Sequence, residues 1–144
     1  MKRIARSAIL ERSADALYAM IEDIESYPEF LPWCSAAHVR ERSAARTVAT
    51  LDVGAGGVRH SFTTENENTP GRAIVMRLLE GPFRHFAAQW NLTPLGPQAT
   101  KIEFLLEYEF ANRIVARALE PLFKRIADST VEAFAHHATG RPDG

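Results

Sequence analysis

The chain has 144 residues, 46% of them hydrophobic, and its 18 acidic and 17 basic side chains give a formal net charge of −1. This length and composition are those of one globular domain with a sizeable core, and they disfavour nucleic acid, DNA included, as a direct ligand because phosphate-backbone binding normally requires a basic excess. Cys34 is the single cysteine, which excludes an intrachain disulfide and a multi-cysteine metal site.

The two ends of the chain bear on targeting and on domain limits. Residues 1–6 are charged, and no continuous apolar stretch follows them, so we expect no signal-peptide core, no membrane-spanning segment and a cytoplasmic protein. Residues 139–144 have the composition of a disordered tail. We therefore predict one domain over residues 1–138.

A strand over residues 2–11 and a short amphipathic helix are the first predicted elements. Ser13 is a candidate N-cap, because its hydroxyl can accept a hydrogen bond from the first helical turn. The apolar residues of this helix recur at helical spacing: Leu17, Met20, Ile21 and Ile24.

Residues 23–34 (DIESYPEFLPWC) form an aromatic run that contains two prolines. Each proline fixes its own φ and disfavours the α region for the residue before it, so we expect Phe30, Leu31 and Trp33 on a rigid turn. Large apolar side chains on a turn need a partner. Either they plug the end of a sheet, or they form a gate for a ligand or a membrane.

Six segments alternate between apolar and polar residues, as half-buried strands do: 36–43, 45–53, 58–66, 72–79, 84–93 and 99–110. Glycine and proline lie between most of them and favour tight turns. These patterns predict one antiparallel meander with a single apolar face.

A long helix is predicted from the candidate N-cap Asn112 to about Ala138, with a bend near residues 119–123 because Pro121 lies inside it. Arg113, Arg117, Lys124 and Arg125 lie along this helix. They are either a solvated face or a contact for anionic lipid or ribosomal RNA. The adjacent His136 and His137 are expected to be solvated near its C-terminal end.

The predicted class is α+β: a curved antiparallel sheet of about seven strands wrapped around a long C-terminal helix, with two short helices after the first strand. This arrangement resembles the helix-grip fold of the START-like, or Bet v 1-like, superfamily. Three segments narrow the resemblance: residues 23–34, residues 81–85 (GPFRH) with Trp90 and 93–96 (TPLG), and residues 121–128 (PLFKRIAD) with 131–134 (VEAF). They are similar to the coenzyme-Q-binding START-domain family, whose bacterial members are also called RatA-type ribosome association toxins, within the polyketide cyclase/dehydrase and lipid transport superfamily.

The resemblance implies a non-catalytic protein with an internal cavity, and inward-facing residues are the candidate lining. His60 could donate a hydrogen bond to a quinone carbonyl or be a core histidine, and Tyr108 has the same two interpretations. No catalytic residue or metal ligand is predicted, because the sequence lacks motifs such as G-x-S-x-G and H-E-x-x-H. The candidate ligand-binding residues are Phe30, Leu31, Trp33, His60, Phe62, Met76, Phe86, Trp90, Phe104, Tyr108, Leu119 and Phe123.

Three functions follow from the resemblance. The first is a carrier or chaperone that binds ubiquinone or another isoprenoid lipid, supports respiration and makes transient contact with the inner-membrane surface. The second is a toxin that binds the large ribosomal subunit and blocks subunit association. The third, a polyketide cyclase or dehydrase, ranks last because no acid/base pair is evident on the inner face. No cofactor is expected beyond the bound lipid.

Overall fold

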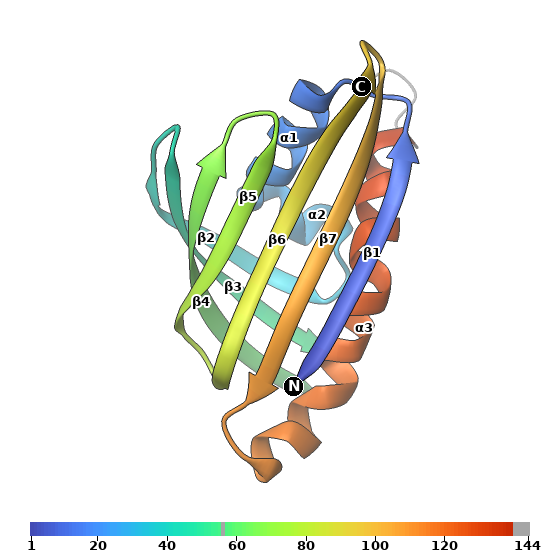
Figure 1. The fold of residues 1–144 in the computed structure, drawn as a ribbon. Helices are drawn as coiled ribbons and strands as arrows, with labels where there is room; N and C mark the ends of the chain where they lie inside the picture. The colour runs from blue at the N-terminus through green and yellow to red at the C-terminus, as the bar shows by residue number, and fades with distance from the viewer. Residues whose placement is uncertain (56, 140–144) are drawn as a thin grey trace.

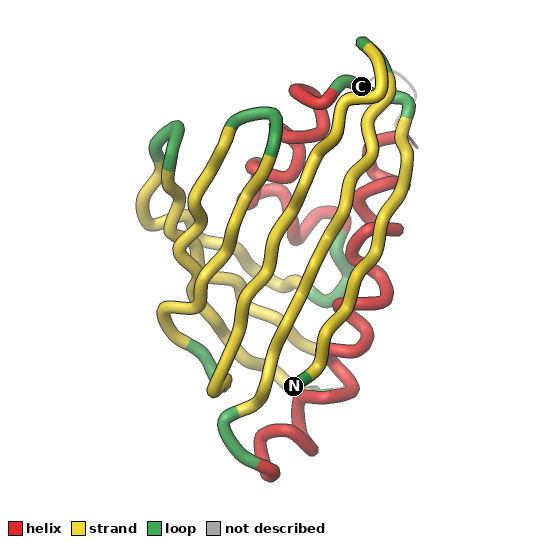
Figure 2. The backbone as a smooth tube through the Cα atoms, viewed as in Figure 1, coloured by secondary structure: helices red, strands yellow, loops and turns green. Residues whose placement is uncertain are grey.

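The computed structural model describes residues 1–55 and 57–139, which form a curved antiparallel sheet packed on one long helix (Figures 1 and 2). The strands are β1 (Lys2–Leu10), β2 (Cys34–Arg42), β3 (Arg46–Ala55), β4 (Val58–Thr69), β5 (Ala73–Glu80), β6 (Phe83–Gly96) and β7 (Ala99–Phe110). The helices are α1 (Ala14–Glu22), the 3₁₀ helix η1 (Ile24–Ser26), α2 (Tyr27–Phe30) and α3 (Arg113–Thr139). The predicted helix-grip architecture is confirmed.

The seven strands follow the order β1-β7-β6-β5-β4-β3-β2. Strands β2 to β7 form the predicted meander, and β1 pairs antiparallel with β7, with Lys2 opposite Tyr108 and Leu10 opposite Thr100. In Figure 1 the ribbons of β2 and β3 cross behind β5 and β6, so the sheet curls. Helix α3 packs against β1 and β7.

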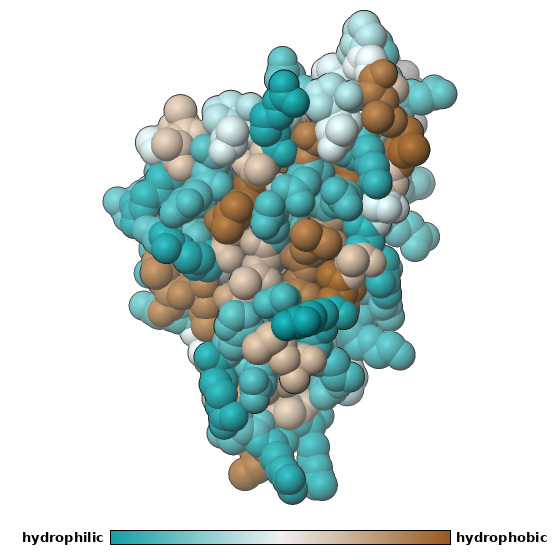
Figure 3. Space-filling view, in the orientation of Figure 1, coloured by the Kyte–Doolittle hydropathy of each residue, from teal (hydrophilic) through white to brown (hydrophobic). Residues whose placement is uncertain are grey.

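The core lies between the concave face of the sheet and the apolar stripe of α3. Phe123 of α3 contacts Phe83, with ring centroids 4.9 Å apart, and Phe134 contacts Trp90 at 5.0 Å. Side chains that alternate with the core positions along each strand point to the convex face, which is mainly hydrophilic with some apolar patches (Figure 3). Burial of each large apolar side chain contributes about 1.5–3 kcal/mol, so the contact between helix and sheet is the main source of stability.

Residues 23–34 do not form the rigid turn expected from their prolines. They fold as η1 and α2, and Tyr27 is helical, at φ −53° and ψ −41°, although it precedes Pro28. Proline is tolerated in the first turn of a helix, because its missing N–H would have no partner there. The Tyr27 hydroxyl donates to the Ile21 carbonyl of α1, which fastens α2 to α1.

Both predicted N-caps are present. Ser13 Oγ accepts from the Ala16 N–H at 3.1 Å, and Asn112 Oδ1 accepts from the Val115 N–H at 2.9 Å. Helix α3 continues through Pro121, and its first turns lean away from the axis of the rest (Figure 1).

The last turn of α3 differs from expectation. His137 is half-buried and stacks on Phe30, with ring centroids 3.9 Å apart and planes 2° from parallel, whereas His136 is exposed as predicted. The sequence pattern could not show that α2 would meet this turn. The predicted disordered tail, residues 139–144, lies outside the described residues except for Thr139, which ends α3.

Two aliphatic residues of α3 allow a matched test of this packing. Leu119 is 0% exposed and Ile114 is 82% exposed. We expect Leu119→Ala to lower the free energy of unfolding by about 2–5 kcal/mol, because it removes buried methyl groups and leaves a cavity. Ile114→Ala should change it by less than about 0.5 kcal/mol. Urea unfolding of both variants measures the difference, and equal effects would contradict the described position of α3.

The thiol of Cys34 provides a second test. Cys34 is 4% exposed, and burial raises the pKa of its thiol to about 11. Only the thiolate is nucleophilic, and at pH 8 such a group is ionised in about one molecule in a thousand. We expect iodoacetamide to label the native protein far more slowly than the urea-unfolded protein, with a rate that increases as the pH rises from 7 to 10. Equal labelling rates for the two forms would contradict the burial.

Candidate functional site

An apolar cavity of about 70 Å³ lies between the concave face of the sheet and α3. Its walls come from α2 and the residues after it, from β3 to β7 and from the buried face of α3. The lining residues are Tyr27, Leu31, Trp33, Leu51, Phe62, Thr64, Met76, Phe86, Ala88, Trp90, Phe104, Leu106, Phe123, Ile126, Thr130 and Phe134.

Most polar groups of the lining are already bonded within the protein. The Thr64 hydroxyl donates to Asn66 Oδ1 at 2.8 Å, and the Thr130 hydroxyl donates to the Ile126 carbonyl one turn earlier in α3. The buried indole Nε1–H of Trp33 has no partner among the described residues. Because an unpaired buried donor costs about 1–3 kcal/mol, this N–H is the lining group most in need of an acceptor.

The size of the cavity limits what it can hold as it stands. Ligand pockets usually enclose about 300–1,000 Å³, and an engineered cavity that binds benzene measures about 150 Å³. The 70 Å³ found here is smaller than either. A quinone ring therefore fits only if lining side chains move. Leu51, Met76 and Phe86 are half-buried, and methionine in particular repacks readily.

The structure brings together eight of the twelve candidate ligand-binding residues in this lining: Leu31, Trp33, Phe62, Met76, Phe86, Trp90, Phe104 and Phe123. Ligand binding by them stays a prediction. Phe30, His60, Tyr108 and Leu119 lie elsewhere.

Each of these four residues lies outside the cavity lining for a different reason. His60 has the expected parity in β4 but lies near the strand's start and is exposed. Leu119 is completely buried in the core. Phe30 packs against Phe134 and His137, and so covers the C-terminal part of α3 from outside the cavity. Tyr108 lines a different pocket, together with Lys2 and Glu120.

Sequence reasoning missed half of the lining. The missed α3 residues Ile126, Thr130 and Phe134 continue from the predicted Phe123 at three- or four-residue spacing, so the helical period could have found them. Ala88 shares the inward face of β6 with Phe86 and Trp90 but was not among the candidate residues, and its small size leaves space.

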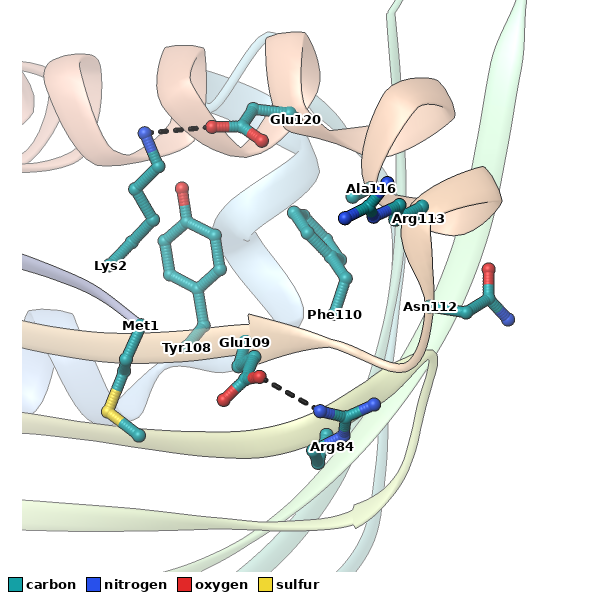
Figure 4. Close-up of a pocket in the computed structure, with 10 residues that line it drawn as sticks. All are labelled: Met1, Lys2, Arg84, Tyr108, Glu109, Phe110, Asn112, Arg113, Ala116 and Glu120. Carbon is teal, nitrogen blue, oxygen red and sulfur yellow. Dashed lines mark hydrogen bonds and ion pairs between the residues drawn. The ribbon is translucent and has the colours of Figure 1, made fainter.

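A second pocket, open to solvent and about 390 Å³ in volume, lies where the N-terminus of the chain meets the start of α3. Lys2 Nζ lies 2.9 Å from Glu120 Oε1, and Arg84 Nη1 lies 3.1 Å from Glu109 Oε2 (Figure 4). The Tyr108 hydroxyl points toward α3 (Figure 4), and burial, with the nearby Glu120 carboxylate, raises the pKa of this tyrosine. Both carboxylates of this pocket are thus paired.

A third, shallower hollow of about 540 Å³ continues from this pocket along α3. It is lined by Arg113, Ala116, Arg117, Glu120, Pro121 and Lys124. Three of these six residues are cations and one, Glu120, is an anion, whereas the inner cavity is apolar.

Within residues 1–55 and 57–139, no three His, Cys, Asp or Glu side chains gather closely enough to hold a metal ion. None of the helices described is both long and apolar enough to cross a membrane.

Known proteins resemble the chain at three levels. It is 40% identical over 138 residues to the "Ribosome association toxin RatA" of Vibrio cholerae, a match that covers 96% of each chain. It is 25% identical over 143 residues to the Xenopus laevis "Coenzyme Q-binding protein COQ10 homolog B, mitochondrial", covering 95% of this chain and 59% of that protein. Its fold matches the Zhui aromatase/cyclase of Streptomyces sp. R1128 with a TM-score of 0.84 at 19% identity, over 99% and 98% of the two chains.

The likeness to the aromatase/cyclase shows a shared fold and no more, because the identity is low. Residues 10–135 match the family described as "Polyketide cyclase / dehydrase and lipid transport". With the full-length similarity to RatA, this match settles the family. The chain belongs to the polyketide cyclase / dehydrase and lipid transport family and, within it, to the RatA-type ribosome association toxins, as the three sequence segments indicated.

Proposed function

We propose that this protein binds the large ribosomal subunit in the cytoplasm and blocks subunit association, without catalysing a reaction. The observation that carries the proposal is the 40% identity, over 96% of both chains, to a protein named as a ribosome association toxin. The order of the sequence-based alternatives therefore changes, and ribosome binding precedes the lipid carrier.

Two features of the molecule support a binding role at the surface. The inner cavity of about 70 Å³ is too small, as it stands, for the quinone ring of a carrier's ligand. The hollow along α3, by contrast, is open and lined by three cations, Arg113, Arg117 and Lys124, which suit an anionic macromolecular partner.

Sedimentation with purified ribosomal subunits tests this function. We expect the protein to migrate with the large subunit in a sucrose gradient and to be absent from the small-subunit fraction. When it is added before the subunits are mixed, the peak of joined ribosomes should decrease and the free-subunit peaks should increase. Binding that covers a subunit interface has this effect, because the second subunit can no longer dock.

The Zhui aromatase/cyclase is a suitable control, because it shares the fold with a TM-score of 0.84 but is only 19% identical. It should neither sediment with the large subunit nor change the joined-ribosome peak. If our protein stays at the top of the gradient even at low salt, ribosome binding is ruled out.

A second candidate function is binding of a hydrophobic ligand, ubiquinone or another isoprenoid lipid, as a carrier that supports respiration. The observation that favours it is the apolar cavity with the unpartnered Trp33 Nε1–H, which could donate to a ligand carbonyl. The distant similarity to a protein named as coenzyme Q-binding agrees with it. Apolar burial at about 25 cal/mol per Å² would supply the affinity, and outward movement of Met76 and Phe86 would supply the space.

Filling the cavity tests this candidate. Ala88 lines the cavity, whereas its neighbour Ala87 points to the opposite face of β6. We expect Ala88→Leu to weaken binding of a short-tailed ubiquinone at least about tenfold, or 1.4 kcal/mol, while Ala87→Leu leaves it unchanged. Quenching of tryptophan fluorescence measures the affinity. Equal affinity of the two variants would exclude the cavity as the binding site.

A further inference from the structure

Three cations form one row on the exposed side of α3. Arg113, Arg117 and Lys124 all line the same open hollow. At 3.6 residues per turn they lie within about 40° of one another around the helix, and they extend over about 16 Å along its axis. We call these three residues the basic stripe. Arg125 is also exposed but is turned about 120° from Arg113, and it does not line the hollow.

No carboxylate of the described residues forms an ion pair with the basic stripe. The hollow and the adjoining pocket contain two carboxylates: Glu120, which pairs with Lys2, and Glu109, which pairs with Arg84. No ion pair involves Arg113, Arg117 or Lys124 in residues 1–55 and 57–139. A local excess of three positive charges therefore lies on a protein whose formal net charge is −1.

The stripe begins where cations are least favourable for the helix itself. The N-terminus of a helix carries partial positive charge, so acidic residues stabilise its first turn and cations destabilise it by about 0.3–1 kcal/mol each. The first turn of α3 begins with Arg113 and contains no acidic residue. Natural proteins depart from such local preferences mainly at functional sites, so the cations at the start of α3 mark a candidate site.

The chemistry of the stripe favours a phosphate backbone over a lipid surface. Arginine and lysine in a row match successive phosphates, and arginine can bind each through two N–H donors. A membrane-surface helix needs a wide exposed apolar face beside its cations. In α3 the apolar face is buried against the sheet, and Ile114 is the large hydrophobic residue that is well exposed, at 82%.

We propose that the basic stripe is the surface through which this protein binds the RNA phosphate backbone of the large ribosomal subunit. This inference rests on the proposed function and deepens it, because it names the partner chemistry and the residues. RNA binding is then local, and the near-zero net charge of the whole chain does not oppose it.

Charge reversal with a matched control tests the inference. The stripe variant carries Arg113→Glu, Arg117→Glu and Lys124→Glu. The control variant carries Arg40→Glu, Arg59→Glu and Arg72→Glu, three exposed cations of β2, β4 and the β4–β5 turn. Both variants change the net charge equally. Circular dichroism and thermal unfolding of each protein verify that both variants fold.

The readout is the affinity for purified large subunits between 50 and 200 mM KCl. Each phosphate contact contributes about 0.7–0.9 to the slope of log affinity against log salt, so the stripe variant should lose about two to three units of slope. Between 50 and 200 mM KCl the affinity of the wild-type protein should therefore fall about 20- to 40-fold more than that of the stripe variant. The control variant should keep most of the wild-type slope, and Arg113→Lys with Arg117→Lys should keep it as well, since the charge is retained.

The outcomes separate this inference from the function on which it rests. If the wild-type protein binds the large subunit and the stripe variant has the same slope as the control, the stripe is not the contact and the proposed function stands. If the wild-type protein does not bind, both fail. If the stripe variant loses only its affinity for vesicles of anionic phospholipid and binds subunits normally, the stripe is a lipid contact and the inference is wrong.

Discussion

The contact between α3 and the concave face of the sheet is the interaction on which the rest of this structure depends. A sheet with one apolar face is unstable in water unless that face is covered, and α3 covers it with Phe123, Ile126 and Phe134. Because the sheet curls around a single helix, coverage is incomplete near β3 to β6. The residual space is the apolar cavity of about 70 Å³. The cavity is thus a consequence of the fold, and its existence alone is weak evidence for a ligand.

Periodicity explains why so much of the fold could be predicted from the sequence. Alternation in β7 and the three-to-four spacing in α3 are both set by one apolar face, so type and order of elements follow from local pattern. The position of a residue along an element, relative to the cavity, does not follow from that pattern. His60 has the parity of Phe62, yet it is exposed, because parity identifies a face and not where the helix covers it. Leu119 faces the core, as its helical spacing predicts, but it does not border the cavity, because the helical period identifies the buried face and not the part of it beside the space.

The segment with two prolines shows a different limit. Proline disfavours helix at the preceding residue, yet Tyr27 is helical because its ring is buried and its hydroxyl is bonded to the Ile21 carbonyl. A hydrogen bond contributes about 1 kcal/mol and burial of an aromatic ring adds to it, so tertiary contacts of this kind outweigh the local preference. The same contacts bury Leu31 and Trp33, so the aromatic run closes the core and presents only Phe30, half-buried, toward the last turn of α3.

The two candidate binding sites lie on opposite sides of helix α3. Its buried side supplies Phe123 and Ile126 to the cavity, and its exposed side supplies Arg117 and Lys124 to the hollow. Side chains on opposite sides of a helix share few partners, so substitutions on the two faces should act nearly independently. Net charge and composition average over these faces, which is why they argued against RNA for the chain as a whole. The distribution of charge on one helix argues the other way, and for a binding surface the local distribution is the relevant quantity.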